Sequence, residues 1–290
     1  MTLKLDLNEN AWGPPPAVVR AVRTIGSEAI RTYPDAGPTA ARVAGALGVP
    51  PAALRLTNGA DEAIQAVFEA VLKPGDELIL PVPTFSFYGE AARRRRARVF
   101  EVPYREGFRF PLAAACRALG RRPRLVVIVS PNNPTGTRLA RADLLRLLDR
   151  AGRADVLLDE TYAPFAGPCF ARLVRSRPNL AVVGSFSKFQ GMAGLRLGYV
   201  AAGPALLARI EQALPPYSVN AAALVAAEAA LSADADLRRM KGKLIAERRR
   251  LAAGLRRLGL RVFSGAANFL LADAGAGCSG LCARLRASGV

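Results

Sequence analysis

Between about residues 54 and 200, short apolar runs alternate with segments of helical periodicity, and this alternation constrains the fold more than any other feature. Segments with a helical pattern include 61–72, 85–95 and 141–150. The apolar runs between them predict strands at residues 77–81, 98–102, 125–129, 156–159, 181–184 and 197–201. Strands that alternate with helices in this way predict an α/β fold with a mostly parallel sheet.

After Pro204 the pattern changes to longer helices and two short strands, which predicts a second, smaller domain. The helices are expected at residues 204–213, 219–230, 234–258 and from about 278, and the strands at 260–263 and 268–272. We therefore expect an N-terminal arm and helix over residues 1–32 that joins the small domain, a large domain over residues 33–213, and the small domain over residues 214–290.

The 290 residues include no histidine, which excludes several catalytic and metal-binding arrangements. Ser–His–Asp catalysis, a histidine general base and a His-ligated zinc site all require that side chain. The four cysteines are scattered and are expected to be reduced thiols, and no metal site is expected. Proton transfer must therefore rely on Lys, Tyr, Asp, Glu, Cys or a cofactor.

The chain carries 41 Lys plus Arg against 23 Asp plus Glu, a net charge of +18, which would suit a nucleic-acid surface. However, no aromatic residues are interleaved with the basic run at residues 93–96, and such runs are usually solvated helix faces. No apolar run reaches the roughly 18 residues that a membrane span needs, and the N-terminus lacks the apolar core of a secretion signal. We expect a cytoplasmic protein with neither a nucleic-acid nor a membrane partner.

Polar residues follow several predicted strands, at the edge of the sheet where α/β proteins bind ligands. Residues 57–62 (TNGADE) predict a small-residue turn that opens a helix, and its free backbone amides would suit an anion. Alternatively, an Asn-Gly turn that only caps the helix would explain the same residues. Residues 130–136 place two amides, Asn132 and Asn133, directly after a buried strand, which a turn alone does not explain.

Asp159 ends an apolar strand, where burying an unpaired carboxylate would cost several kcal/mol. The carboxylate therefore requires a cationic partner or, alternatively, caps the following turn. Tyr162 follows three residues later and would reach the same crevice.

Lys188 is the only lysine between Lys73 and Lys241, in a chain that otherwise uses arginine. Arginine cannot replace a lysine whose amine must lose its proton to act as a nucleophile, although an ordinary surface lysine would look the same. The segment around Lys188 also contains Ser185, Ser187 and Arg196. Taken together, the four segments offer a nucleophilic amine, a buried carboxylate, an Asn–Tyr pair, and an anion site with two hydroxyls and an arginine. This is the set of groups needed to hold pyridoxal phosphate.

Seven motifs, in the same order along the chain, resemble those of the fold-type I, class I/II aminotransferases, and most closely the histidinol-phosphate aminotransferases. The motifs are residues 7–14 (LNENAWGP), 33–35 (YPD), 58–62 (NGADE), 83–88 (PTFSFY), 130–136 (SPNNPTG), 159–162 (DETY), and 187–188 (SK) with 194–196 (GLR). The resemblance implies the PLP-dependent transferase fold of type I, whose large domain has a mostly parallel seven-stranded sheet. It also implies amino-group transfer between a substrate such as L-histidinol phosphate and 2-oxoglutarate, as part of amino-acid biosynthesis.

The resemblance further implies roles for individual residues. Lys188 would bind the cofactor covalently and move the proton at the substrate carbon, and Asp159 would keep the pyridine nitrogen protonated. The remaining cofactor-binding residues would be Phe85 on the ring face, Asn133 and Tyr162 at the phenolic oxygen, and Ala60, Asp61, Ser185, Ser187 and Arg196 at the phosphate. Tyr33 would reach the phosphate of a neighbouring subunit in a homodimer. Asn10 and Trp12 would lie near the substrate.

The chain departs from the family pattern in three places. Phe85 and Trp12 stand where relatives often have tyrosine. Phe85 keeps the stacking ring but lacks the hydroxyl, whereas Trp12, near the substrate side chain, leaves specificity for histidinol phosphate open. The chain ends at Val290, before strands that in this family carry an arginine for the substrate's anionic group. We therefore expect a small, incomplete α+β domain, cofactor binding and weak transamination. A threonine-phosphate decarboxylase-like enzyme and an aminotransferase-like DNA-binding regulator are the alternatives.

Overall fold

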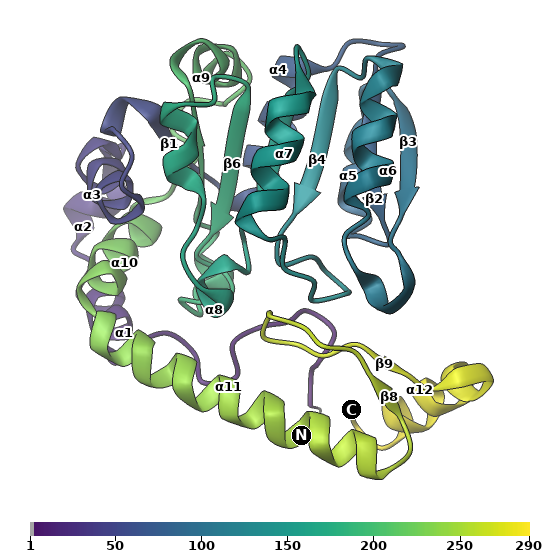
Figure 1. Ribbon diagram of the computed structural model, residues 1–290. Helices are drawn as coiled ribbons and strands as arrows, with labels where there is room; N and C mark the ends of the chain where they lie inside the picture. Colours follow the sequence, from purple (N-terminus) through teal and green to yellow (C-terminus); the bar gives the residue numbers. More distant parts are fainter. Residues whose placement is uncertain (1–2) are drawn as a thin grey trace.

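The computed structural model describes residues 3–290 and places a seven-stranded sheet between layers of helices (Figure 1). The strand order is β1-β7-β6-β5-β4-β2-β3, and β7 runs antiparallel to its neighbours β1 and β6 while the other pairs are parallel. The strands are β1 (Leu54–Thr57), β2 (Glu77–Val82), β3 (Arg98–Pro103), β4 (Leu125–Val129), β5 (Asp155–Asp159), β6 (Leu180–Ser185) and β7 (Gly198–Ala202). The predicted α/β fold with a mostly parallel seven-stranded sheet is confirmed.

Helices bury both faces of the sheet. Successive side chains of a strand point to opposite faces, so the central strands contribute to both apolar clusters. In β4, Leu125, Val127 and Val129 belong to one apolar cluster, whereas Val126 and Ile128 belong to the other. The first cluster is covered by α4 (Gly59–Val71), α5 (Phe87–Arg94) and α9 (Pro204–Glu211). Helices α3 (Gly37–Leu47), α6 (Leu112–Ala118) and α7 (Arg141–Ala151) contribute to the second. The continuous apolar runs of the sequence thus correspond to strands covered on both sides.

The predicted strands of the sheet agree with the structure to within one residue at each end, but β1 was not among them. Its four residues include the partly exposed Arg55, so the segment carries no continuous apolar signal. The predicted strand at residues 268–272 is wrong except at its last position, because only β8 (Arg261–Val262) and β9 (Ala272–Asp273) pair there.

The C-terminal part of the chain curves around the sheet edge at which the parallel strands end (Figure 1). Helix α10 (Ala221–Ser232) leads into the long α11 (Asp234–Arg257), and the β8–β9 hairpin and α12 (Cys278–Ala287) lie at the far end of α11. Near the N-terminus, α1 (Pro16–Arg23) packs against α10. The N-terminal arm that precedes α1 passes between α11 and the sheet. In the described part of the chain, no helix has both the length and the apolarity needed to span a membrane.

Candidate active site

A cavity of about 420 Å³ opens at the carboxyl ends of the parallel strands, and ten of the predicted cofactor-binding residues line it. These ten are Ala60, Asp61, Phe85, Asn133, Asp159, Tyr162, Ser185, Ser187, Lys188 and Arg196. They come from six segments of the chain that the strand order brings to one edge of the sheet. Residues of the N-terminal arm complete the lining, including Leu7 and Glu9.

One wall of the cavity is the first turn of α4, whose amides are available to an anion. Asn58 precedes the helix but makes no side-chain cap, and Glu62 instead accepts the Asn58 backbone N–H at 2.7 Å. The first amides of a helix have no partner within it, and here Ala60 and Asp61 line the cavity. Gly59 has φ +77°, and a Cβ at Gly198 would lie 2.4 Å from the Gly59 carbonyl carbon, so β7 supports this turn at very short range.

Ser185, Ser187 and Arg196 line the same cavity. Ser185 ends β6, and its hydroxyl oxygen accepts the Ser187 backbone N–H at 3.0 Å. The Arg196 guanidinium donates to Asp61 Oδ2 at 3.0 Å. Backbone amides, two hydroxyls and a guanidinium therefore converge in an arrangement that is suited to a phosphate group.

Asp159 lies buried at the end of β5, and both of its carboxylate oxygens accept hydrogen bonds. Oδ2 accepts the Tyr88 hydroxyl at 2.7 Å, and Oδ1 accepts the Thr161 backbone N–H at 2.8 Å. Burial raises the pKa of Asp159, and these two hydrogen bonds oppose the rise. Because no basic side chain within residues 3–290 forms an ion pair with it, this carboxylate can still bind a cationic N–H of a ligand.

Lys188 follows β6 and reaches into the cavity. Its Nζ donates to the Leu7 carbonyl oxygen at 2.6 Å, so the N-terminal arm contacts the amine directly. Burial lowers the pKa of Lys188, an effect that Arg196 reinforces and that Glu9 and Asp61 oppose. A lowered pKa increases the fraction of neutral amine, which is the nucleophilic form.

Three further predicted residues surround the space between Asp159 and Lys188. The Tyr162 hydroxyl accepts the Asn8 Nδ2–H at 3.2 Å, and burial raises the pKa of Tyr162 to about 12. Asn133 lines the cavity, while its neighbour Asn132 is buried. The Phe85 ring is 41% exposed, which leaves it free to stack against a planar ligand.

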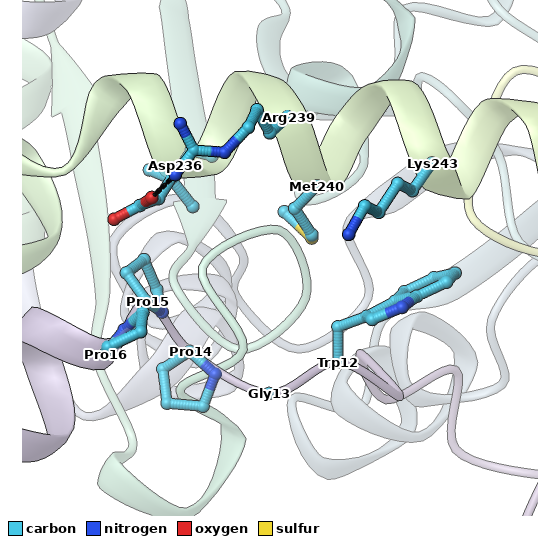
Figure 2. A pocket seen from close by; sticks show the side chains of 10 residues that line it. Trp12, Gly13, Pro14, Pro15, Pro16, Asp236, Arg239, Met240 and Lys243 are labelled. Atoms are coloured by element: carbon cyan, nitrogen blue, oxygen red, sulfur yellow. Dashed lines mark hydrogen bonds and ion pairs between the residues drawn. The ribbon is translucent and has the colours of Figure 1, made fainter.

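The structure places the other three predicted site residues outside this cavity. Asn10 is buried, where its side chain donates to Met240 Sδ and to the Phe189 carbonyl and accepts the Trp12 backbone N–H. Trp12 lines a separate cavity of about 170 Å³, into which Met240 and Lys243 point from α11 (Figure 2).

Tyr33 lies on the surface, where it is 80% exposed. Its ring stacks on Tyr217 at a centroid distance of 4.5 Å. The single chain therefore does not bring Tyr33 to its own Lys188.

Four residues that contact the predicted groups lie within the motifs of the sequence, but the sequence analysis assigns them no role. They are Leu7, Asn8, Tyr88 and Thr161, which bond to Lys188, Tyr162 and Asp159. Tyr88 belongs to one of these motifs, but only the tertiary structure brings its hydroxyl, from the first turn of α5, to Asp159 at the end of β5. Leu7 acts through its backbone oxygen, for which the residue type carries no signal.

The amino-acid sequence of this chain is similar to those of known aminotransferases. Histidinol-phosphate aminotransferase from Roseiflexus castenholzii is 41% identical over 277 residues, which cover 93% of this chain and 74% of that protein. An aromatic amino acid aminotransferase from Streptomyces coelicolor is 37% identical and covers 92% of this chain and 76% of its own length.

The fold also matches solved structures. Histidinol-phosphate aminotransferase from Sinorhizobium meliloti, solved in complex with pyridoxal-5'-phosphate, superposes with a TM-score of 0.91 at 24% identity, over 98% of this chain and 80% of that one. The family model for aminotransferase class I and II matches residues 1–287. On this match and on the Roseiflexus relative, the chain belongs to the class I and II aminotransferases, which depend on pyridoxal phosphate.

Proposed function

We propose that this aminotransferase acts on L-histidinol phosphate, with 2-oxoglutarate accepting the amino group. The observation that carries the proposal is one cavity that combines the Lys188 amine, the buried Asp159 carboxylate and an anion site at the start of α4. The name of the Roseiflexus relative supports the substrate. An aromatic amino acid is the second candidate, and the Streptomyces relative supports it.

The residues of the cavity fit pyridoxal phosphate. The uncapped first turn of α4 suits the phosphate, and the buried Asp159 carboxylate suits a protonated ring nitrogen because no cation of the described chain neutralises it. When bound, pyridoxal phosphate supplies an electron sink for negative charge that develops on the substrate carbon.

Each residue then has a defined task in the proposed site. The Lys188 amine would hold the cofactor covalently, and as a free amine it would move the proton at the substrate carbon. Asp159 keeps the proton on the ring nitrogen, and Asn133 and Tyr162 donate to the phenolic oxygen. Phe85 covers one face of the ring. The phosphate is held by the amides of Ala60 and Asp61 together with Ser185, Ser187 and Arg196.

We further propose a homodimer in which Tyr33 of each subunit reaches the phosphate in its partner's cavity. The support is the position of Tyr33, exposed and away from the Lys188 cavity of its own chain. The division into parts at residues 1–32, 33–213 and 214–290 remains part of the proposal. The packing of α1 against α10 supports the grouping of the first part with the third.

The experiment combines cofactor attachment with turnover. After addition of pyridoxal phosphate and reduction with borohydride, peptide mass spectrometry should find the cofactor on Lys188. Lys188→Ala should remove the attachment and reduce glutamate formation by at least about 10³-fold, whereas the exposed control Lys73→Ala should change neither.

Comparison of kcat/KM for histidinol phosphate, phenylalanine and tyrosine then ranks the substrates. Attachment at another lysine would contradict the assignment of Lys188. Release of carbon dioxide without glutamate would contradict the proposed reaction.

A further inference from the structure

Tyr88 is a buried polar side chain at the wall of the cavity, and the proposed reaction gives it no task. It lies in the first turn of α5, and only 1% of its surface is exposed. The residues that pack around α5 and the neighbouring strands are apolar, including Leu78, Leu80 and Leu157. A buried hydroxyl in such surroundings needs a partner, and its partner is Asp159 Oδ2, 2.7 Å away.

The hydrogen bond has a fixed direction. Burial raises the pKa of Tyr88 well above its ordinary value, and the charge of Asp159 and the nearby Tyr162 and Asp61 raise it further. The phenol therefore keeps its proton around neutral pH, and it donates to the carboxylate. A permanent donor stabilises the ionised form of an acid.

Asp159 needs such a donor because its position favours the neutral acid. Burial is the largest influence on the pKa of Asp159 and raises it, and the nearby charge of Asp61 raises it slightly more. The hydrogen bond from Tyr88 is the largest influence in the opposite direction, ahead of the contacts from Thr161. A neutral Asp159 would not hold a protonated ring nitrogen by charge.

Tyr88 also contacts the side chain that is proposed to stack on the cofactor ring. The Phe85 and Tyr88 rings pack edge to face, with centroids 6.1 Å apart and planes at 89°. One side chain thus touches both the residue on the ring face and the acid at the ring nitrogen.

We infer that Tyr88 is a positioning residue, which acts through Asp159 to hold that carboxylate ionised and directed at the pyridine nitrogen of the cofactor. This inference rests on the cofactor site proposed above. It adds a residue that acts on the cofactor through the Asp159 carboxylate.

The test measures the dissociation constant of pyridoxal phosphate for the purified protein, across pH values from about 5 to about 8.5. Tyr88→Phe keeps the ring and removes the donor. Loss of a hydrogen bond to a charged group should weaken cofactor binding by about tenfold or more near the low end of this range. The loss should shrink as the pH rises, because Asp159 then ionises without help.

A matched control and a second background isolate the mechanism. Tyr104→Phe removes another largely buried tyrosine hydroxyl, one that packs against Phe110 away from the cavity, and should leave binding unchanged at every pH. In an Asp159→Asn background, Tyr88→Phe should cause no further loss, because the two side chains act as one unit.

If Tyr88→Phe does not fold, 3-fluorotyrosine incorporated at position 88 keeps the shape and makes the hydroxyl a stronger donor. Cofactor affinity should then persist to lower pH than in the wild-type protein. Wild-type affinity and pH dependence in Tyr88→Phe, an equal loss at every pH, an additive loss in the Asp159→Asn background, or no shift with the fluorinated residue would each overturn the inference. Failure of the wild-type protein to bind the cofactor would instead contradict the proposed function.

Discussion

Burial favours the neutral forms of both Lys188 and Asp159, and the consequences for the two residues are opposite. The pKa of Lys188 is lowered, which makes the amine reactive. The pKa of Asp159 is raised, which works against its proposed task and requires the donors Tyr88 and Thr161. A lysine nucleophile therefore needs little beyond an enclosed position, whereas a buried carboxylate depends on several partners.

Glu160, the next residue after Asp159, is a second buried carboxyl group whose pKa is raised, but it has no task in the proposed reaction. Both of its oxygens accept the Phe170 backbone N–H, at 2.8 and 2.9 Å. Burial raises the pKa of Glu160 to about 8. In an unfolded chain, Glu releases its proton at about pH 4.3. Between these two values the folded state holds a proton that the unfolded state lacks, so the free energy of unfolding falls as pH rises.

Glu160→Gln should therefore make thermal stability less dependent on pH. The Gln side chain can still accept the Phe170 N–H but does not ionise, so the melting temperature should fall less between about pH 5 and about pH 8 than in the wild-type protein. Glu160 accounts for at most ~1.4 kcal/mol per pH unit of the wild-type slope. The exposed Glu101→Gln serves as control and should follow the wild-type curve. Parallel curves for Glu160→Gln and the wild type would show that Glu160 is not the group responsible.

At the scale of elements, the anion site depends on the contact between β7 and the start of α4. The Gly198 Cα lies so close to the Gly59–Ala60 peptide that an added Cβ would be 2.6 Å from the Ala60 nitrogen. Both surfaces are backbone, so neither can move aside as a side chain would. The position of the helix amides is thus set by the absence of a side chain on a neighbouring strand.

Gly198→Ala should push α4 away from β7 and disturb the proposed phosphate site. We expect a loss of about 1–3 kcal/mol in the free energy of unfolding and weaker binding of pyridoxal phosphate. Gly89→Ala is the matched control, because a Cβ at this position in α5 meets nothing within 4 Å. It should be neutral or stabilising by up to ~1 kcal/mol. Urea unfolding and cofactor titration measure both effects, and unchanged values for Gly198→Ala would contradict the tight contact.

At the scale of the whole molecule, parts distant in sequence enclose the cavity. The N-terminal arm supplies Leu7 and Asn8, and Asn268, between β8 and β9, donates to the Asn8 carbonyl at 2.9 Å. Asn8 itself has φ +52°, a left-handed conformation that Asn tolerates better than most residues. The segment between β8 and β9 thus contacts the arm that covers Lys188, without itself lining the cavity.

Mixed dimers test the proposed exchange of Tyr33 between subunits. Tyr33→Ala and Lys188→Ala should each be strongly impaired alone, since every site then lacks one component. Random mixing of the two variants should restore about a quarter of the wild-type sites, because half of the dimers are mixed and each has one complete site. Analytical ultracentrifugation must show dimers in both variants. A mixture no more active than its parts would contradict the exchange.

Local sequence patterns were sufficient to predict most strands of the seven-stranded sheet. β4 is a run of five apolar, mostly β-branched residues, so its position could be predicted from the sequence. β1 has a weaker pattern, and β9 is two residues long and is defined only by its pairing with β8. Short strands of this kind draw their stability from partners, so their own residues predict them poorly.

The order of motifs along the chain was enough to determine the family and the residues that carry reactive groups, because amines, carboxylates and helix starts are properties of single segments. The tertiary structure alone decided which groups meet. It brings Tyr88 to Asp159 and the Leu7 carbonyl to Lys188, and it keeps Asn10, Trp12 and Tyr33 out of the cavity. These contacts join residues as far as 181 positions apart. They depend on strand order and helix packing over the whole chain, for which no local pattern in the sequence contains a signal.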